Sequence, residues 1–524
     1  MLSVCRLLTV AAVSLASSRL AVAQSAPDAR APYDLVIANG RAIDPETGLD
    51  GQRSIGIRNG RIAAISRTPL RGRTVLDAKG LIISPGFIDL HTHGVELPGA
   101  RMQAFDGVTT GLELEAGTLP VSMAYERAAT EGRPINYGFA ASWLFARIAE
   151  KQAMEPTGAI TFFQEAQKRT GWQHSLATAE ETSRIVARIQ RGLDDGALGI
   201  GILAGYAPGY GRKEAFAVAS LAAQRGVPTF THVRYLSVIE PQSSFEAMEE
   251  IVSLAAATGA HMHIVHLNSN STRDIPRIAE LIRGAQQRGA RITTEAYPYG
   301  AGSTVVGAEI FRGNWRERLG GATAGDIELG GVPLTDSSLA DAQARTPGAW
   351  IVSHFMRPDR SPTDQAYLDQ SVLFPGGAIA SDAMPWTLKG QPITGDVWPL
   401  PADAFAHPRS AGTFTRFLRE YVRERQQLSL RDGLRRMTLV PAQILEASVP
   451  QMKRKGRLQV GADADLAVFD LATVSDRATY TEPNRRADGM RHVIVNGVPV
   501  IREGELVRTA LPGQAIRRPV VGPR

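Results

Sequence analysis

Two histidines at the end of an apolar stretch, His91 and His93, are the residues best placed for chemistry in this sequence. They close the segment Ser84-Pro-Gly-Phe-Ile-Asp-Leu-His-Thr-His-Gly94, which predicts a turn followed by a buried strand. Side chains two apart on a strand lie on one face, so both imidazoles can point at one ion. Imidazole is a common metal ligand and suits Zn²⁺. The alternative is a pair of structural histidines, because a bare His-x-His pattern is a weak signal.

Other residues of metal-binding type also end short apolar runs. They are Glu113, Glu115, His232, His266 and Asp382. A carboxylate in an apolar strand costs free energy to bury unless it is paired or bound to metal. If these runs are neighbouring parallel strands, their ends meet, and the acids and histidines face one another. The alternative for Asp382 is a helix N-cap.

The middle of the chain, residues 84–450, alternates short apolar runs with helical patterns, which predicts βα units around a parallel sheet. Eight such units close into a (β/α)₈ TIM barrel, whose chemistry lies at the carboxyl ends of the strands. Residues 300–348 are weakly periodic, which indicates an insertion or lid. Helices are expected at Thr178–Asp194, Arg212–Arg225, Phe245–Thr258 and Asp274–Arg288. The eight expected strands are Gly86–His93, Thr110–Gly117, Ile135–Trp143, Ala197–Gly205, Val227–Arg234, His261–Asn268, Arg291–Tyr299 and Ala378–Asp382.

The two flanking regions, residues 31–83 and 451–510, both carry strand patterns joined by Asn-Gly turns. Examples are Asn59-Gly60 and Asn496-Gly497. We therefore expect one small β-sandwich built from both terminal regions. The predicted fold class is α/β, a (β/α)₈ TIM barrel with this second, smaller domain.

The composition and the first residues of the chain limit the kinds of binding partner and the cellular location to be expected. The chain has 524 residues and a net charge of +6 without a Lys/Arg block, so we expect no nucleic-acid partner. Residues 1–23 have the charge, apolar run and small-residue cleavage site of a signal peptide, with an uncleaved anchor as the alternative. We expect an exported protein, periplasmic or secreted, with no membrane span after signal removal. A homo-oligomer is left open. Cys5, the only cysteine, lies in this segment, so the mature chain has no thiolate ligand.

Longer segments resemble the amidohydrolase superfamily, and within it the N-acyl-D-amino-acid deacylases (D-aminoacylases). Pro85–His93 is similar to the first-strand motif of the superfamily. The resemblance continues over nearly the whole chain after the signal region. Further segments that resemble the deacylases are Gly196–Gly209, Thr231–Arg234, Tyr297–Thr304, His407–Phe414 and Gly456–Leu466.

The resemblance implies a metal-dependent enzyme that hydrolyses a linear amide next to a carboxylate, as in an N-acyl-(D-)amino acid. His91 and His93 would bind one metal and His232 and His266 the other, with one or two Zn²⁺ or other divalent ions. Asp382 would take a proton from the water that the metal activates and pass it to the leaving amine. The alternatives are a dipeptidase or cyclic amidase on the same site and, more remotely, a binding protein without catalysis.

The sequence departs from related enzymes at the ligand that bridges the metals. Related enzymes use a cysteine after strand two or a carboxylated lysine on strand four. Ala116 stands at the first position, and the run Ala197–Gly205 contains no lysine. The resemblance therefore leaves a strand-two glutamate, preferably Glu115, with Glu113 as the other candidate.

A second departure concerns the substrate. Related deacylases often carry a lysine near the substrate where this chain has Asn268. The cation for a substrate carboxylate would then be Arg234, Arg357 or Arg409, although Arg234 has a structural alternative as the partner of Glu295. Tyr206 and Tyr297 are expected to line the pocket or to stabilise an oxyanion. His261 and His263 are expected to be structural, and His174 and His492 to lie at the surface.

Overall fold

The computed structural model describes residues 32–521, so the predicted signal peptide 1–23 lies outside the described residues. Eight parallel strands form one sheet in the order β17-β12-β11-β10-β9-β8-β7-β6. Each overlaps one of the eight predicted strands, which confirms the predicted barrel. Their bounds are β6 (Phe87–Asp89), β7 (Val108–Thr118), β8 (Asn136–Ser142), β9 (Ile200–Leu203), β10 (Pro228–His232), β11 (His261–Ile264), β12 (Ile292–Ala296) and β17 (Ala378–Ile379).

The barrel closes between its first and last strands, β6 and β17. The backbone N–H of Asp382 donates to the carbonyl of His91 at 2.8 Å. The buried carboxylate of Asp89 accepts from the backbone N–H groups of Ser381 at 2.9 Å and of His91 at 3.1 Å. Closure therefore brings His91 and Asp382, which are far apart in the sequence, to the same end of the barrel.

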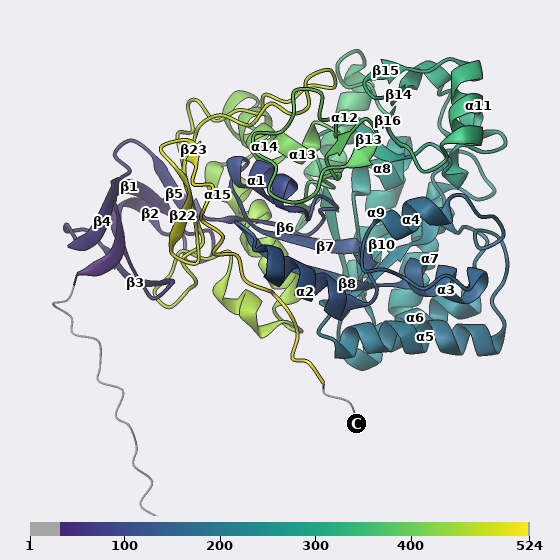
Figure 1. Ribbon diagram of the computed structural model, residues 1–524, viewed down its shortest axis with the longest axis horizontal. Helices are drawn as coiled ribbons and strands as arrows, with labels where there is room; N and C mark the ends of the chain where they lie inside the picture. Colours follow the sequence, from purple (N-terminus) through teal and green to yellow (C-terminus); the bar gives the residue numbers. More distant parts are fainter. Residues whose placement is uncertain (1–31, 522–524) are drawn as a thin grey trace, which may run out of the picture. The chain divides into compact units, whose positions relative to one another are not determined.

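Helices surround the strands (Figure 1), and consecutive helices contact one another. The four predicted helices begin and end within two residues of their predicted bounds. Capping boxes at Thr178 and Ser243 fix two of the starts, because each side chain and the glutamate three residues later satisfy free backbone N–H groups. The main helices are α1 (Leu97–Phe105), α2 (Val121–Glu131), α3 (Trp143–Gln152), α4 (Thr161–Ala166), α5 (Ala179–Asp194), α6 (Arg212–Arg225), α7 (Ser244–Thr258), α8 (Leu267–Ser271), α9 (Ile275–Gln287), α12 (Pro362–Val372), α13 (Arg409–Gly412), α14 (Phe414–Phe417), α15 (Leu430–Met437) and α16 (Leu439–Leu445).

Strands from both terminal regions form a second sheet, in which β5 pairs antiparallel with β20. The purple and yellow strands lie side by side in Figure 1. Asn59-Gly60 and Asn496-Gly497 both have positive φ, as the predicted hairpin turns require. The domain boundaries at 83 and 450 stay a prediction. The strands are β1 (Tyr33–Ile43), β2 (Asp50–Arg58), β3 (Arg61–Ser66), β4 (Gly72–Asp77), β5 (Ile82–Pro85), β20 (Leu466–Phe469), β21 (Met490–Val495), β22 (Val498–Arg502) and β23 (Glu505–Leu506).

The region after strand β12 contains a small sheet rather than an irregular loop. Its strands are β13 (Ala301–Val305), β14 (Ile327–Leu329), β15 (Val332–Pro333) and β16 (Trp350–His354), with helices α10 (Trp315–Arg318) and α11 (Asp336–Arg345) between them. Its role as a lid stays a prediction.

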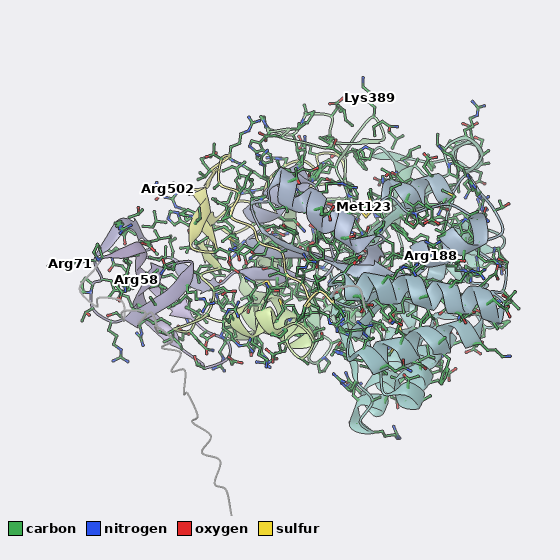
Figure 2. All side chains as sticks on the ribbon, turned by 60° about the horizontal axis from the view of Figure 1, so that its bottom comes forward. Arg58, Arg71, Met123, Arg188, Lys389 and Arg502 are labelled. Carbon is green, nitrogen blue, oxygen red and sulfur yellow. The ribbon has the colours of Figure 1, made fainter. Side chains whose placement is uncertain are left out.

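The outer surface carries charged side chains. Lys389, Arg71 and Arg502 are exposed and project into solvent in Figure 2. Lys389 lies in the turn of a short hairpin, β18 (Thr387–Leu388) and β19 (Gln391–Pro392). Within residues 32–521, every helix is too short or too polar to cross a membrane.

Candidate metal centre and active site

The carboxyl ends of the barrel strands bring the predicted histidines and acids together. The structure has two groups of potential metal ligands. Within each group the ligand atoms all lie within 4.8 Å of one another, and Glu115 belongs to both groups. Strand β6 leads into the first histidine pair, β10 and β11 lead to one further histidine each, and β17 leads to the aspartate. The groups are His91, His93, Glu115 and Asp382, and Glu115, His232 and His266.

Glu115 lies between the two pairs of histidines. Its Oε2 is 3.1 Å from His91 Nε2 and 3.2 Å from His93 Nε2. Its Oε1 is 2.8 Å from His266 Nε2 and 3.1 Å from His232 Nδ1. Each oxygen therefore faces one pair, as a carboxylate that bridges two cations would.

Glu113 takes a different position, although it shares a strand face with Glu115. Its Oε2 accepts from Nδ1–H of His93 at 2.7 Å, on the side of the ring away from Glu115. Glu295 on β12 does the same for His91, with Oε1 at 2.7 Å from Nδ1. A carboxylate that accepts from Nδ1–H fixes the ring and leaves Nε2 as the nitrogen that would bind a metal in each histidine.

The charge of the cluster also fits a bound cation. Four buried carboxylates contact these histidines: Glu113, Glu115, Glu295 and Asp382. Burial alone would lower the pKa of His91, but Asp382 and Glu115 outweigh it and hold the pKa well above its usual value. Buried carboxylates at this density need compensating positive charge. The donor types and the charge are both those of a divalent metal site.

Asp382 lies at the edge of this cluster beside a buried arginine. Its Oδ1 is 3.4 Å from His91 Nε2, 3.5 Å from His93 Nε2 and 2.9 Å from Arg409 Nη2. Burial alone would raise the pKa of Asp382, but Arg409 and His91 outweigh it and lower it to about 2. Asp382 has φ of 51° and His266 has φ of 29°, a region that non-glycine residues seldom adopt and that is enriched at functional sites.

A cavity opens over the cluster. It is lined by His93, Glu115, His232, His266 and Asp382 together with Tyr206 and Tyr297. Gly205 makes room for the His232 ring, because a Cβ there would lie 2.8 Å from ring atoms. Among the described lining residues, none is Lys or Arg. Much of the remaining wall is apolar, including Phe163, Leu236, Ile310, Phe311, Trp350 and Phe355.

Arg409 lies directly behind this lining. Its guanidinium is 4.6 Å from the ring of Tyr297, and a Cβ on Gly302 would lie 3.6 Å from its Nη1. Arg409 is 1% exposed; its Nη2 pairs with Asp382, its Nε donates to the carbonyl of Asp382, and its Nη1 makes no hydrogen bond. Of the three predicted arginines, it is the one that the structure brings to the cluster.

Three predicted substrate-binding residues, Arg234, Arg357 and Asn268, do not line the cavity. Arg234 Nη2 lies 2.6 Å from Glu250 Oε1 on α7, and Arg357 Nη2 lies 2.7 Å from Asp326 Oδ1. Nδ2 of Asn268 donates to the carbonyl of Tyr299.

Two sequence interpretations are wrong. Arg234 does not pair with Glu295, because its side chain turns outward to Glu250 on helix α7 while Glu295 points inward to His91 and His263. His492 is not at the surface, because β21 places it between neighbouring strands with its side chain 1% exposed. His174 is at the surface as predicted, with its side chain 63% exposed.

Sequence reasoning missed residues that orient the histidine rings of the site, namely Glu295 beside His91 and Ser269 beside His266. Glu295 was considered only as a partner of Arg234, and Ser269, whose Oγ lies 2.9 Å from His266 Nδ1, was not considered. The signal was available for Glu295, since it is an acid within an apolar strand of the barrel.

Comparisons with known proteins agree with this site. A sequence profile of the Amidohydrolase family matches residues 74–274 and 267–501. An N-acyl-D-glutamate deacylase of Alcaligenes xylosoxydans xylosoxydans is 29% identical over 514 residues, which cover 93% of this chain and 96% of the relative. A D-aminoacylase of the same organism is 28% identical over 90% of this chain and 95% of the relative.

A solved structure gives the same picture. The N-acyl-D-glutamate deacylase from Bordetella bronchiseptica, complexed with zinc and a phosphonate inhibitor, superposes with a TM-score of 0.73 at 25% identity, over 93% of this chain and 100% of that one. These comparisons confirm the resemblance to the deacylases. Because the family profile spans more than half of the sequence, the chain belongs to the Amidohydrolase family.

Proposed function

We propose that this chain is a metal-dependent deacylase that hydrolyses N-acyl-amino acids, with D-configured substrates and Zn²⁺ as its metal. The observation that carries the proposal is the position of Glu115, whose two oxygens each face a histidine pair beside Asp382. The full-length similarity to an N-acyl-D-glutamate deacylase and a D-aminoacylase supports the reaction and the stereochemistry.

The ligand roles follow from the two groups. His91 and His93 would hold one ion, His232 and His266 the other, and Glu115 would contact both; one or two ions fit this set. A divalent cation bound there lowers the pKa of water and polarises an amide carbonyl. Glu113 and Glu295 keep the Nε2 atoms of the first pair directed at the site.

Asp382 moves the proton in this proposal. Its carboxylate lines the cavity, within 3.5 Å of both first-pair Nε2 atoms, where it would be within reach of a water and a leaving nitrogen held at the site. It accepts a proton from the water and donates it to the amine that leaves, which is general acid–base catalysis. Arg409 holds the carboxylate in place at 2.9 Å.

The cavity supports a substrate with one carboxylate and an apolar remainder. Arg409, whose Nη1 makes no hydrogen bond behind Tyr297 while its Nη2 pairs with Asp382, is the cation that we assign to the α-carboxylate. A second carboxylate, as in N-acyl-glutamate, would meet the apolar wall and pay for its lost hydration. The hydroxyl of Tyr206 lies 2.7 Å from Thr304 Oγ1. Burial raises the pKa of the Tyr206 phenol, so the phenol stays neutral and does not repel an anionic substrate.

The proposal is tested by following amine release from N-acetyl-D-leucine, N-acetyl-L-leucine and N-acetyl-D-glutamate with zinc-loaded protein. We expect turnover of N-acetyl-D-leucine, little of the other two, and loss of activity after chelation that zinc restores. Preference for the L-isomer would refute the stereochemistry. Activity that is unchanged by complete chelation would refute the metal-dependent mechanism.

We also propose that the chain is exported, supported by the signal-like features of residues 1–23. To test this, the full chain is expressed and the N-terminus of the purified protein is sequenced. A mature protein beginning near Gln24 is expected, and an intact Met1 terminus in the cytoplasm would contradict it. Size measurement of the same sample tests the homo-oligomer that the sequence left open.

A further inference from the structure

A chain of hydrogen bonds, buried at its inner end and partly buried at its outer end, runs from His91 through the barrel interior toward the amino ends of the strands. Glu295 Oε1 lies 2.7 Å from His91 Nδ1, and its Oε2 lies 3.1 Å from His263 Nε2. Thr293 Oγ1 lies 2.9 Å from His263 Nδ1 and 2.8 Å from His261 Nε2. We call these five residues the interior chain. It crosses strands β11 and β12 to reach His91, two residues after the end of β6.

The donors and acceptors of the interior chain fix one direction. The Glu295 carboxylate can only accept, so Nδ1–H of His91 and Nε2–H of His263 both donate to it. A neutral His263 then has a lone pair on Nδ1, which accepts the hydroxyl proton of Thr293. Thr293 Oγ1 in turn accepts from Nε2–H of His261. Every polar atom along the path has a partner of the right kind.

The charges along the path agree with this direction. The two oxygens of Glu295 are both occupied, one by His91 and the other by His263. Burial and the neighbouring His263 lower the pKa of His261 to about 3, so that ring is neutral. Glu295 and His263 are almost fully buried, at 1% and 0% exposure. Removing His263 therefore leaves a Glu295 oxygen buried and unpaired, whereas Thr293, at the outer part of the path, is only partly buried.

We propose that His263 and Thr293 are positioning residues that act through Glu295 to hold the His91 ring with its Nε2 lone pair toward the metal. Neither residue lies in the ligand groups, and neither lines the cavity over the site. The proposal rests on the proposed function, because it concerns the metal site on which that function depends. Partners of this kind typically change metal affinity about 10- to 100-fold when removed.

A purely structural role predicts a different pattern. If the interior chain only fills the barrel, its variants lower the stability of the protein but leave the affinity of the folded protein for zinc unchanged. Zinc affinity and the visible spectrum of the Co²⁺-substituted protein separate the two roles, since both report on the ligands directly. Neither readout requires turnover.

The experiment compares Thr293→Val with Thr293→Ser and with Thr294→Val in the full chain. Valine is close in shape to threonine but lacks the hydroxyl, and serine keeps it. Thr294 is buried in the same strand, with its side chain on the opposite face, and so is the matched control. His263→Phe removes the donor to Glu295 itself. Zinc affinity is measured by competition with a chromophoric chelator.

We expect His263→Phe to weaken zinc binding about 10- to 100-fold and Thr293→Val by about tenfold, with an altered Co²⁺ spectrum in both. Thr293→Ser and Thr294→Val should bind zinc as the wild type does. Should His263→Phe fail to fold, Thr293→Val decides alone. Equal affinities for Thr293→Val, Thr294→Val and wild type would overturn the inference and leave the proposed function intact. A wild-type protein that binds no zinc would refute the proposed function, and this inference with it.

Discussion

Replacing Glu115 by glutamine tests the difference between the two glutamates of strand β7. Glu115→Gln removes a charge that contacts all four histidines of the site, at 2.8–3.2 Å. Glu113→Gln, one pleat deeper on the same strand, removes only the negative charge beside His93 Nδ1. The amide of glutamine still offers an oxygen to that nitrogen, so the ring can keep its orientation.

The sizes of the two effects follow from these contacts. Breaking a buried ion pair by removing one partner costs about 3–5 kcal/mol. If most of that is lost from metal binding, the affinity falls by about 100- to 3,000-fold, at about 1.4 kcal/mol for each factor of ten. Loss of a group that only supports a ligand costs about 10- to 100-fold. We therefore expect Glu115→Gln to bind zinc at least about tenfold more weakly than Glu113→Gln.

Zinc affinity is measured by chelator competition on both variants and the wild type, with circular dichroism to show that each is folded. Chelated wild-type protein serves as the reference for any change in fold that the loss of metal causes. Equal losses in the two variants, or the larger loss in Glu113→Gln, would show that Glu115 does not bridge the metals.

Three further substitutions follow from the site. Asp382→Asn should lower turnover by about 10²- to 10⁴-fold in steady-state assays while zinc stays bound, and retained turnover would refute its role in proton transfer. Arg409→Met should raise KM for N-acetyl-D-leucine and also lower kcat, because it removes the cation for the carboxylate and the ion pair that holds Asp382, and an unchanged KM would exclude it as the carboxylate partner. Arg234→Met should instead cost about 1–3 kcal/mol of unfolding free energy in a denaturant titration, because it removes two hydrogen bonds to Glu250 and leaves that carboxylate only the exposed Arg212 as a partner. A normal stability with a raised KM would reverse the assignments of these two arginines.

The barrel and the ligand histidines could be predicted because their information is local. Each strand is a short apolar run, and a histidine or acid at its end falls at the carboxyl end of the barrel once eight such runs close. His91 and His93 needed only the two-residue period of a strand to share a face. The Asn-Gly pairs at residues 59–60 and 496–497 likewise encode their own turns.

The partners of these residues could not be predicted because they are set by distant contacts. Glu295 meets His91 across 204 residues of sequence, and nothing local distinguishes that pairing from one with Arg234. Glu113 and Glu115 share one strand face, so periodicity cannot say which of them reaches the depth of the histidine Nε2 atoms. The small sheet of β13–β16 was missed because its strands are short and separated by long weakly periodic segments.

The metal content of the purified mature protein tests the central claim most directly. Elemental analysis by mass spectrometry, normalised to protein concentration, should find one or two zinc ions per chain, and Glu115→Gln should lose most of them. The account would be contradicted if the protein is folded and supplied with zinc but binds no metal. The buried carboxylates and histidines would then not form a metal site.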